Sequence, residues 1–128
     1  MKDYALNGLL IELCDIASFH HYRDAASLDR LVTKLKMHGR PLWCTEYLNR
    51  RGGCLFETHM PVFKREHIAC WNWGLVDGKS QTKFAWSDKS SGQEPEVWFH
   101  DVLRPSGQPY QPVEAAFLRE VSGRGQKG

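Results

Sequence analysis

Apolar residues recur along this chain in two alternating patterns, continuous short runs and stripes at helical spacing. Three continuous runs predict buried strands, over residues 14–20, 41–47 and 68–76. Four stripes predict helices, over residues 4–12, 24–38, 54–66 and 112–121. Strands that alternate with helices through short connections predict an α/β fold with parallel strands.

Local signals mark several boundaries of these elements. Asp24 or Ser27 is expected to cap the helix over 24–38, and Gly39 is expected to end it. Pro61 is expected to kink or restart the helix over 54–66, because proline lacks the backbone N–H that an interior turn needs.

The stretch after the third predicted strand is harder to assign. Asp77-Gly78 predicts a turn, and the polar segment 79–93 is too long for a simple turn. A short helix is expected over 95–103, carrying Trp98 and Phe99, before a turn over 105–109.

Composition places the chain among ordinary globular domains. It has 128 residues, of which 41% are hydrophobic and 25% charged, so one domain is expected over 1–123, with 124–128 as a frayed tail. The net charge of +2 comes partly from that tail, and this argues against nucleic acid as a partner. No apolar stretch is long enough to predict a membrane span.

The first residues lack the charged-then-apolar pattern of a signal peptide. Asp3, Asn7 and Glu12 interrupt the apolar run. Either the chain is cytoplasmic or its true start is missing, so the localisation stays unknown.

The four cysteines are expected to be free thiols. Three of them lie in or beside apolar runs, where cysteine behaves as a small hydrophobic residue. No pair has the spacing of a zinc knuckle, and neither a metal site nor a cofactor is predicted. The one combination left open as a metal site is His20 and His21 with Cys14.

Polar and aromatic side chains follow each predicted strand. The clusters are His20-His21-Tyr22, Glu46-Tyr47 and Trp71-Asn72-Trp73. Carboxyl ends of parallel strands share one edge, where α/β proteins place their chemistry. A carboxylate among aromatic rings favours a sugar site, although a glutamate in the position of Glu46, taken alone, is more often a solvated loop residue, and a histidine in the position of His20 is more often structural.

Other classes of site find no support in the sequence. Dinucleotide and nucleotide sites need G-x-G-x-x-G or G-x-x-x-x-G-K-S/T after a strand, and serine hydrolases of the α/β class need G-x-S-x-G. None of these motifs occurs in the chain.

Two blocks resemble the end of a (β/α)8-barrel glycoside hydrolase, 41–47 and 71–82. The resemblance is to cellulase-like proteins of the large retaining clan that includes the family 5 enzymes. Residues 15–22 are similar to the sixth strand of that group, and 94–101 resemble its closing segment. The resemblance extends over about residues 6–121 and implies a partial TIM barrel with the last three βα units, strands six to eight.

The same resemblance assigns roles to residues. Glu46 matches the catalytic nucleophile that ends the seventh strand, and His20 and Tyr22 match cleft residues that hold it. Trp73 matches the tryptophan beneath the bound sugar, with Trp71 as the second choice. The implied activity is retaining hydrolysis of a β-linked oligo- or polysaccharide.

The resemblance also implies that part of the enzyme is absent. Barrels of this kind run to about 250 residues, and the acid/base carboxyl of this clan belongs to an Asn-Glu pair that this sequence does not contain. We therefore expect an isolated chain that is inactive and that self-associates or pairs with a missing barrel half. The alternative is a non-catalytic remnant that binds a glycan or a protein partner.

Several side chains near the site are expected to be structural. Trp43 should pack beneath a helix, and Trp86 and Trp98 should pack within loops. Arg50 and Arg51 should be exposed after the second predicted strand.

Overall fold

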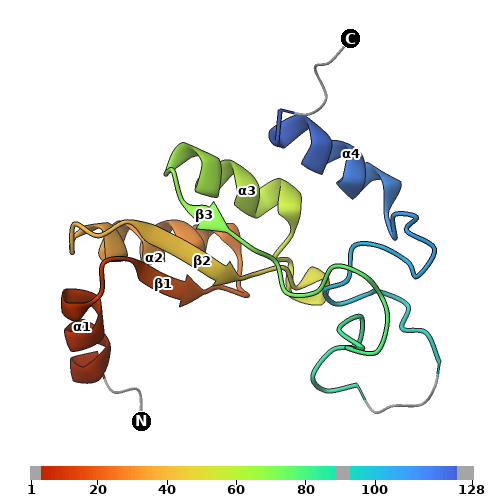
Figure 1. The fold of residues 1–128 in the computed structure, drawn as a ribbon, viewed down its shortest axis with the longest axis horizontal. Coiled ribbons are helices and arrows are strands. Elements are labelled where there is room, and N and C mark those ends of the chain that lie inside the picture. The colour runs from red at the N-terminus through yellow and green to blue at the C-terminus, as the bar shows by residue number, and fades with distance from the viewer. Residues whose placement is uncertain (1–3, 89–92, 124–128) are drawn as a thin grey trace.

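The computed structural model describes residues 4–88 and 93–123. Its centre is a three-stranded sheet in the order β1-β2-β3, in which both strand pairs are parallel (Figure 1). The strands are β1 (Ala17–His20), β2 (Leu42–Glu46) and β3 (Ala69–Cys70). The helices are α1 (Tyr4–Leu13), α2 (Ala25–Lys36), the 3₁₀ turn η1 (Arg50–Gly52), α3 (Phe56–Arg65) and α4 (Pro112–Val121). The predicted α/β class with parallel strands is confirmed.

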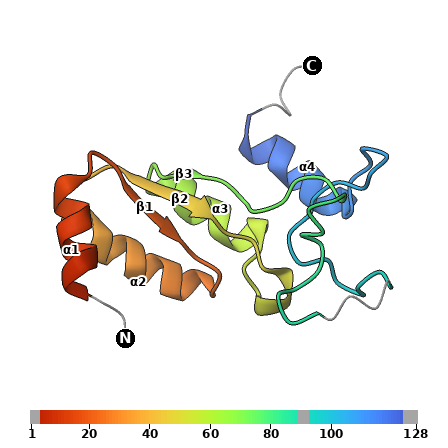
Figure 2. The same cartoon turned by 60° about the horizontal axis from the view of Figure 1, so that its bottom comes forward.

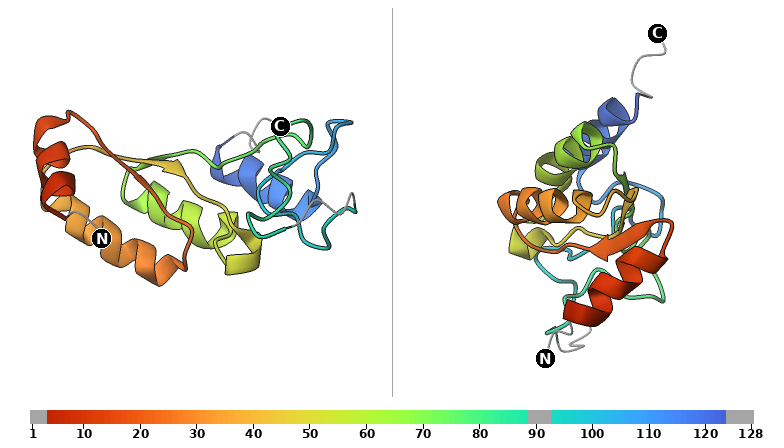
Figure 3. Two further views of the ribbon diagram at one scale, coloured as in Figure 1. Left: turned by 90° about the horizontal axis from the view of Figure 1, so that it is seen from below. Right: turned by 90° about the vertical axis from the view of Figure 1, so that its left-hand side faces the viewer.

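Helices α2 and α3 lie side by side over one face of the sheet (Figure 3). Their apolar stripes meet the alternate residues of the strands that point the same way. The side chains buried in this layer include Ala17, Leu28, Val32, Leu42, Cys44, Val62 and Phe63. The Asp24 carboxylate accepts a hydrogen bond from the Ser27 N–H at 2.8 Å, so the predicted cap of α2 is confirmed.

The opposite face of the sheet carries a different set of side chains. Trp43 lies on this face because its neighbours Leu42 and Cys44 take the helix-covered one. Its ring packs edge-on against Trp71, with the centroids 4.4 Å apart. The expectation that Trp43 packs beneath a helix is therefore wrong.

Helix α1 lies beside the β1 edge of the sheet (Figure 2). A hollow of about 670 Å³ separates it from β1 and α2, and apolar side chains form most of its lining. Leu9, Leu10 and Leu13 of α1 remain exposed. In the described part of the chain, no helix is long and apolar enough to cross a membrane.

The third strand is much shorter than predicted. Only Ala69 and Cys70 pair with β2, and beyond them single backbone bonds from Trp71 and Trp73 follow it. Gly74 has φ +87°, and a Cβ there would lie 2.6 Å from Asp101 Oδ1 and 2.7 Å from Thr82 Oγ1. Glycine at 74 thus allows the later segments to cross close above the end of the sheet.

The helix predicted over 95–103 is wrong. This segment bonds to distant backbone instead, with Phe99 N–H donating to Lys83 O at 2.8 Å and Val102 N–H to Leu75 O at 3.1 Å. The restart predicted at Pro61 is also wrong, because α3 continues through it as one helix.

Helix α4 is attached to the sheet's carboxyl end by a buried ion pair. The Arg50 guanidinium, through Nε and Nη2, donates to both oxygens of the Glu114 carboxylate at 2.7 Å, and its Nη1 donates to Trp98 O at 3.1 Å. The side chains of Arg50 and Glu114 are only 2% and 3% exposed. The expected exposure of Arg50 is wrong, because this carboxylate from α4 covers it.

Candidate active site at the carboxyl edge of the sheet

Glu46 ends β2 at the edge where both longer strands terminate. By simple alternation it would point with Leu42 and Cys44 into the helix-covered core. The register shifts between Phe19 and His20, so that Phe19 pairs with Cys44 whereas His20 pairs with Glu46. A bulge of this kind re-aims a side chain, and it brings Glu46 to the side of His20.

Two side chains from the end of β1 contact the Glu46 carboxylate. The Tyr22 hydroxyl donates to Oε2 at 2.6 Å, and His20 Nδ1 lies 3.2 Å from the same oxygen. Both contacts go to Oε2, so neither occupies Oε1. Burial and the bond to Glu46 raise the pKa of the Tyr22 hydroxyl, which stays a donor at neutral pH.

Aromatic rings extend the site beyond this pair. Trp86 packs edge-on against the Tyr22 ring with the centroids 5.1 Å apart, and its side chain remains 71% exposed. The ring of His100 lies 5.6 Å from Tyr22 and 5.8 Å from Trp86. Trp86 was expected to serve only loop packing, but it presents an exposed indole next to the glutamate's partner.

Tyr22, Trp86 and His100 form an aromatic rim beside Glu46. His100 connects this rim to the chain that follows Glu46. Its Nδ1 bonds Leu48 O at 2.6 Å, and because a carbonyl only accepts, Nδ1 carries the proton. Leu48 has φ +81°, an unfavourable backbone conformation for leucine, and it is fully buried. Burial lowers the pKa of His100, which is therefore neutral at pH 7.

The two predicted tryptophans lie further along the same edge. Trp73 N–H donates to Tyr47 O at 3.3 Å, one residue beyond Glu46, and its side chain is exposed. Trp71 N–H donates to Cys44 O at 2.9 Å, and its ring packs on Trp43. The structure thus joins His20 and Tyr22 directly to Glu46, whereas it attaches the two tryptophans through the backbone.

A second group of polar side chains lies below this rim. His21, Cys54 and His59 are all buried and offer one ligand atom each within 4.8 Å of one another. Burial and the neighbouring His59 lower the pKa of His21 to about 4, and burial also lowers that of His59. Cys14, which the sequence left open as a partner of His21, is exposed and lies outside this group. All four cysteines are free, as expected.

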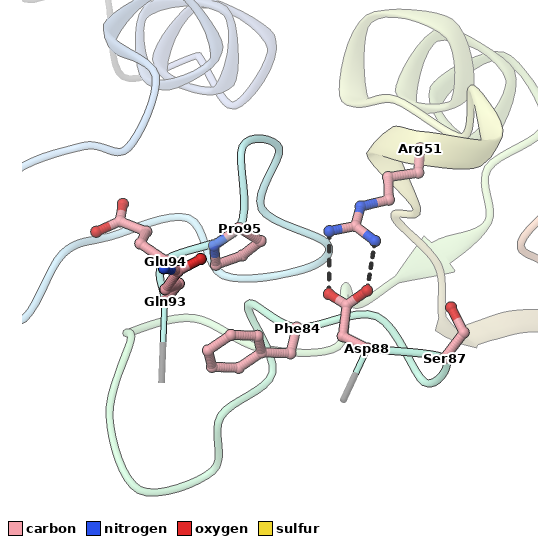
Figure 4. A pocket seen from close by; sticks show the side chains of 7 residues that line it. All are labelled: Arg51, Phe84, Ser87, Asp88, Gln93, Glu94 and Pro95. Carbon is pink, nitrogen blue, oxygen red and sulfur yellow. Dashed lines mark hydrogen bonds and ion pairs between the residues drawn. The ribbon is translucent and has the colours of Figure 1, made fainter. Parts of the chain in front are cut away.

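A separate hollow of about 300 Å³ is lined by Arg51 and by residues from 84–88 and 93–95, and Figure 4 shows these side chains. The Arg51 guanidinium donates to both Asp88 oxygens, at 2.7 and 3.0 Å, so these two charges neutralise each other. Glu46 does not line this hollow.

Sequence reasoning missed Trp86 and His100 as members of the site, and it did not group His21 with Cys54 and His59. The first two come from the irregular segments after β3, whose path depends on long-range backbone bonds. His59 had a local signal, because it lies between Phe56 and Phe63 on the buried stripe of α3. A histidine at such a position is a buried polar group that needs partners.

The fold and site define a parallel α/β sheet with a hydrogen-bonded glutamate at its carboxyl edge. No protein-family model, curated protein or solved structure matches the chain.

Proposed function

We propose that this chain carries the nucleophile of a retaining β-glycoside hydrolase and that Glu46 is that nucleophile. The observation that supports this most directly is the contact of Tyr22 and His20 with Oε2 of Glu46, at 2.6 and 3.2 Å. Tyr22 and His20 hold Oε2 of the carboxylate and leave Oε1 free of their contacts. This arrangement suits attack by Oε1 on an anomeric carbon.

The proposed reaction is a double displacement. Oε1 of Glu46 attacks the anomeric carbon, the bond to the departing oxygen breaks, and a general acid gives that oxygen a proton. The same group then takes a proton from water, which hydrolyses the glycosyl ester and regenerates Glu46. Hydrolysis of the glycan needs no redox partner.

The acid/base carboxyl is proposed to come from outside the described residues. A retaining site needs it about 5 Å from the nucleophile. Three acidic side chains that follow β3 are already held by cations: Asp77 by Lys83 at 2.7 Å, Asp88 by Arg51 and Glu114 by Arg50. We therefore expect this chain alone to be inactive on natural glycans.

The sheet itself supports a larger assembly. All-parallel sheets are normally covered on both faces, whereas Ser18, Ala69 and Trp71 are exposed here. The strands β1 and β3 are both edge strands, and edge strands present unpaired backbone groups. We propose that the three strands are strands six to eight of a (β/α)8 barrel, and that the chain self-associates or pairs with the remaining strands.

The aromatic rim is proposed to bind the sugar. Trp86 offers a largely exposed indole beside Tyr22, and Trp73 offers a second exposed ring near Tyr47. Stacking of sugar rings on indole faces is apolar contact of the kind that aromatic side chains provide. The substrate class is a β-linked oligo- or polysaccharide.

Covalent trapping tests this proposal. A mechanism-based fluoroglycoside with a dinitrophenolate leaving group needs no general acid for its first step, so the chain can be tested without its acid/base partner. We expect peptide mass mapping to locate the sugar on Glu46, with no label in Glu46→Gln and unchanged labelling in the control Glu66→Gln. Label on another carboxylate, or no label together with no glycan binding, contradicts the proposal.

The exposure of Trp86 also supports a second candidate, a non-catalytic remnant that binds glycan. Both candidates predict that β-linked oligosaccharides shift the tryptophan fluorescence and that Trp86→Ala weakens this effect. Only the hydrolase predicts the covalent label on Glu46.

A further inference from the structure

We propose that His21, Cys54 and His59 bind a zinc ion beneath the carboxyl edge of the sheet. The three residues come from three separate segments: the end of β1, the turn after η1, and α3. Their candidate ligand atoms lie within 4.8 Å of one another, and all three side chains are buried. Tetrahedral zinc is bound by imidazole nitrogen at about 2.0–2.1 Å and by thiolate sulfur at about 2.3 Å.

Hydrogen bonding indicates which nitrogen of His21 is available. The Ser27 hydroxyl lies 2.9 Å from Asp24 O, to which it can donate its proton, and 2.9 Å from His21 Nε2, from which it then accepts. In this arrangement the proton of the neutral ring lies on Nε2. The other nitrogen, Nδ1, is a bare lone pair that is buried without a hydrogen-bond partner.

An unpartnered buried nitrogen is costly, and a metal ion would remove that cost. The bond from Nε2–H to Ser27 is the outer interaction that orients metal-bound imidazoles in proteins. The unpartnered lone pair of His21 Nδ1 therefore points to a bound ligand independently of the cluster.

His59 is also prepared for this role. Its two ring nitrogens lie 2.8 Å from Thr58 Oγ1 and 2.8 Å from Arg23 O. Zinc replaces one of these bonds, and the other then holds the ring. When Thr58 is released, its hydroxyl keeps a second acceptor, Leu55 O at 3.2 Å.

Cys54 supplies the third ligand. Its thiol donates to His21 O at 3.5 Å, and its sulfur also lies near the backbone of Leu48 and Asn49. Binding zinc as a thiolate releases the thiol proton to the buffer. A water molecule completes the tetrahedron, as in zinc sites with three protein ligands.

The proposed ion would brace the candidate active site. His21 precedes Tyr22, and its backbone N–H donates to Glu46 O at 2.9 Å. The site joins this strand end to α3, so zinc would stabilise the folded chain whether or not Glu46 is a nucleophile.

Cobalt provides the direct test because it substitutes for zinc and absorbs light. Titration of the metal-free chain with Co²⁺ should give one equivalent of binding, a thiolate-to-cobalt charge-transfer band and the visible bands of four-coordinate cobalt. Zn²⁺ should displace the cobalt and raise the melting temperature in proportion to its binding. We expect Cys54→Ser to abolish the charge-transfer band and His59→Gln to remove the visible bands.

Two variants serve as matched controls. Cys44→Ser changes a cysteine that is equally buried but lies outside the cluster, and His20→Gln changes the adjacent histidine. Both should bind cobalt as the unmodified chain does. Ser27→Ala keeps all three ligands and should weaken binding about tenfold, which keeps the test decisive if a ligand variant fails to fold. The proposal is refuted if the unmodified chain gives no thiolate band, or if the band survives in Cys54→Ser or is lost in either control.

Discussion

The paired arginines after β2 allow a sharp test of the fold. Arg50 and Arg51 are adjacent, and each makes two hydrogen bonds to one carboxylate. The Arg50–Glu114 pair is almost fully buried, whereas Arg51 is 36% and Asp88 19% exposed. The same chemistry is therefore present in two environments.

The predicted magnitudes differ because of burial. Removing one partner of a buried pair costs about 3–5 kcal/mol, since it leaves an uncompensated charge away from water. Glu114 lies in the first turn of α4, where the helix dipole offsets about 0.3–1 kcal/mol. We therefore expect Arg50→Ala to lower the free energy of unfolding by about 2–5 kcal/mol. Arg51→Ala should cost about 0–1 kcal/mol, as exposed pairs do.

Urea unfolding followed by tryptophan fluorescence and circular dichroism measures both values. The double variant Arg50→Met with Glu114→Leu should recover most of the loss, because it removes the buried charges together. Equal costs for Arg50→Ala and Arg51→Ala would refute the reasoning, and so would a double variant as unstable as Arg50→Ala.

The remaining predictions concern the site and the turn that supports it. His100 has a pKa below its ordinary value of 6.5 because it is buried, so protonation favours the unfolded chain. The contribution of the neutral, buried His100 to the free energy of unfolding is therefore fully present above about pH 6.5 and falls as the pH drops below that value. Acid unfolding should be less steep for His100→Gln. Gly74→Ala should cost more than about 2 kcal/mol, since its Cβ would collide with Asp101 Oδ1. Gly107→Ala, also at positive φ but with open space around it, should cost only about 1–2 kcal/mol, and thermal unfolding compares the two. Trp86→Ala should weaken any glycan-induced fluorescence change, with His38→Ala as an exposed control.

The local part of the fold could be predicted from the sequence. The helical stripe from Leu28 to Leu35 and the cap at Asp24 depend on residues three or four apart, and the structure has that helix with that cap. The apolar runs before Tyr22 and Glu46 likewise gave two strands, because burial on a parallel sheet requires apolar side chains. The shared carboxyl edge of these strands brings Glu46, His20 and Tyr22 to one end of the sheet.

Tertiary structure alone decided the rest. The bulge opposite His20 turns the Glu46 side chain to the other face of the sheet. The residues of β2 carry no pattern that predicts this bulge. The backbone of 95–103 bonds to residues 75–83 instead of to itself, so the short helix expected there does not form. Arg50 is buried because it pairs with Glu114, which lies 64 residues further along the chain. The His21, Cys54 and His59 cluster has the same origin, since long-range packing brings together residues whose spacing along the chain carries no metal motif.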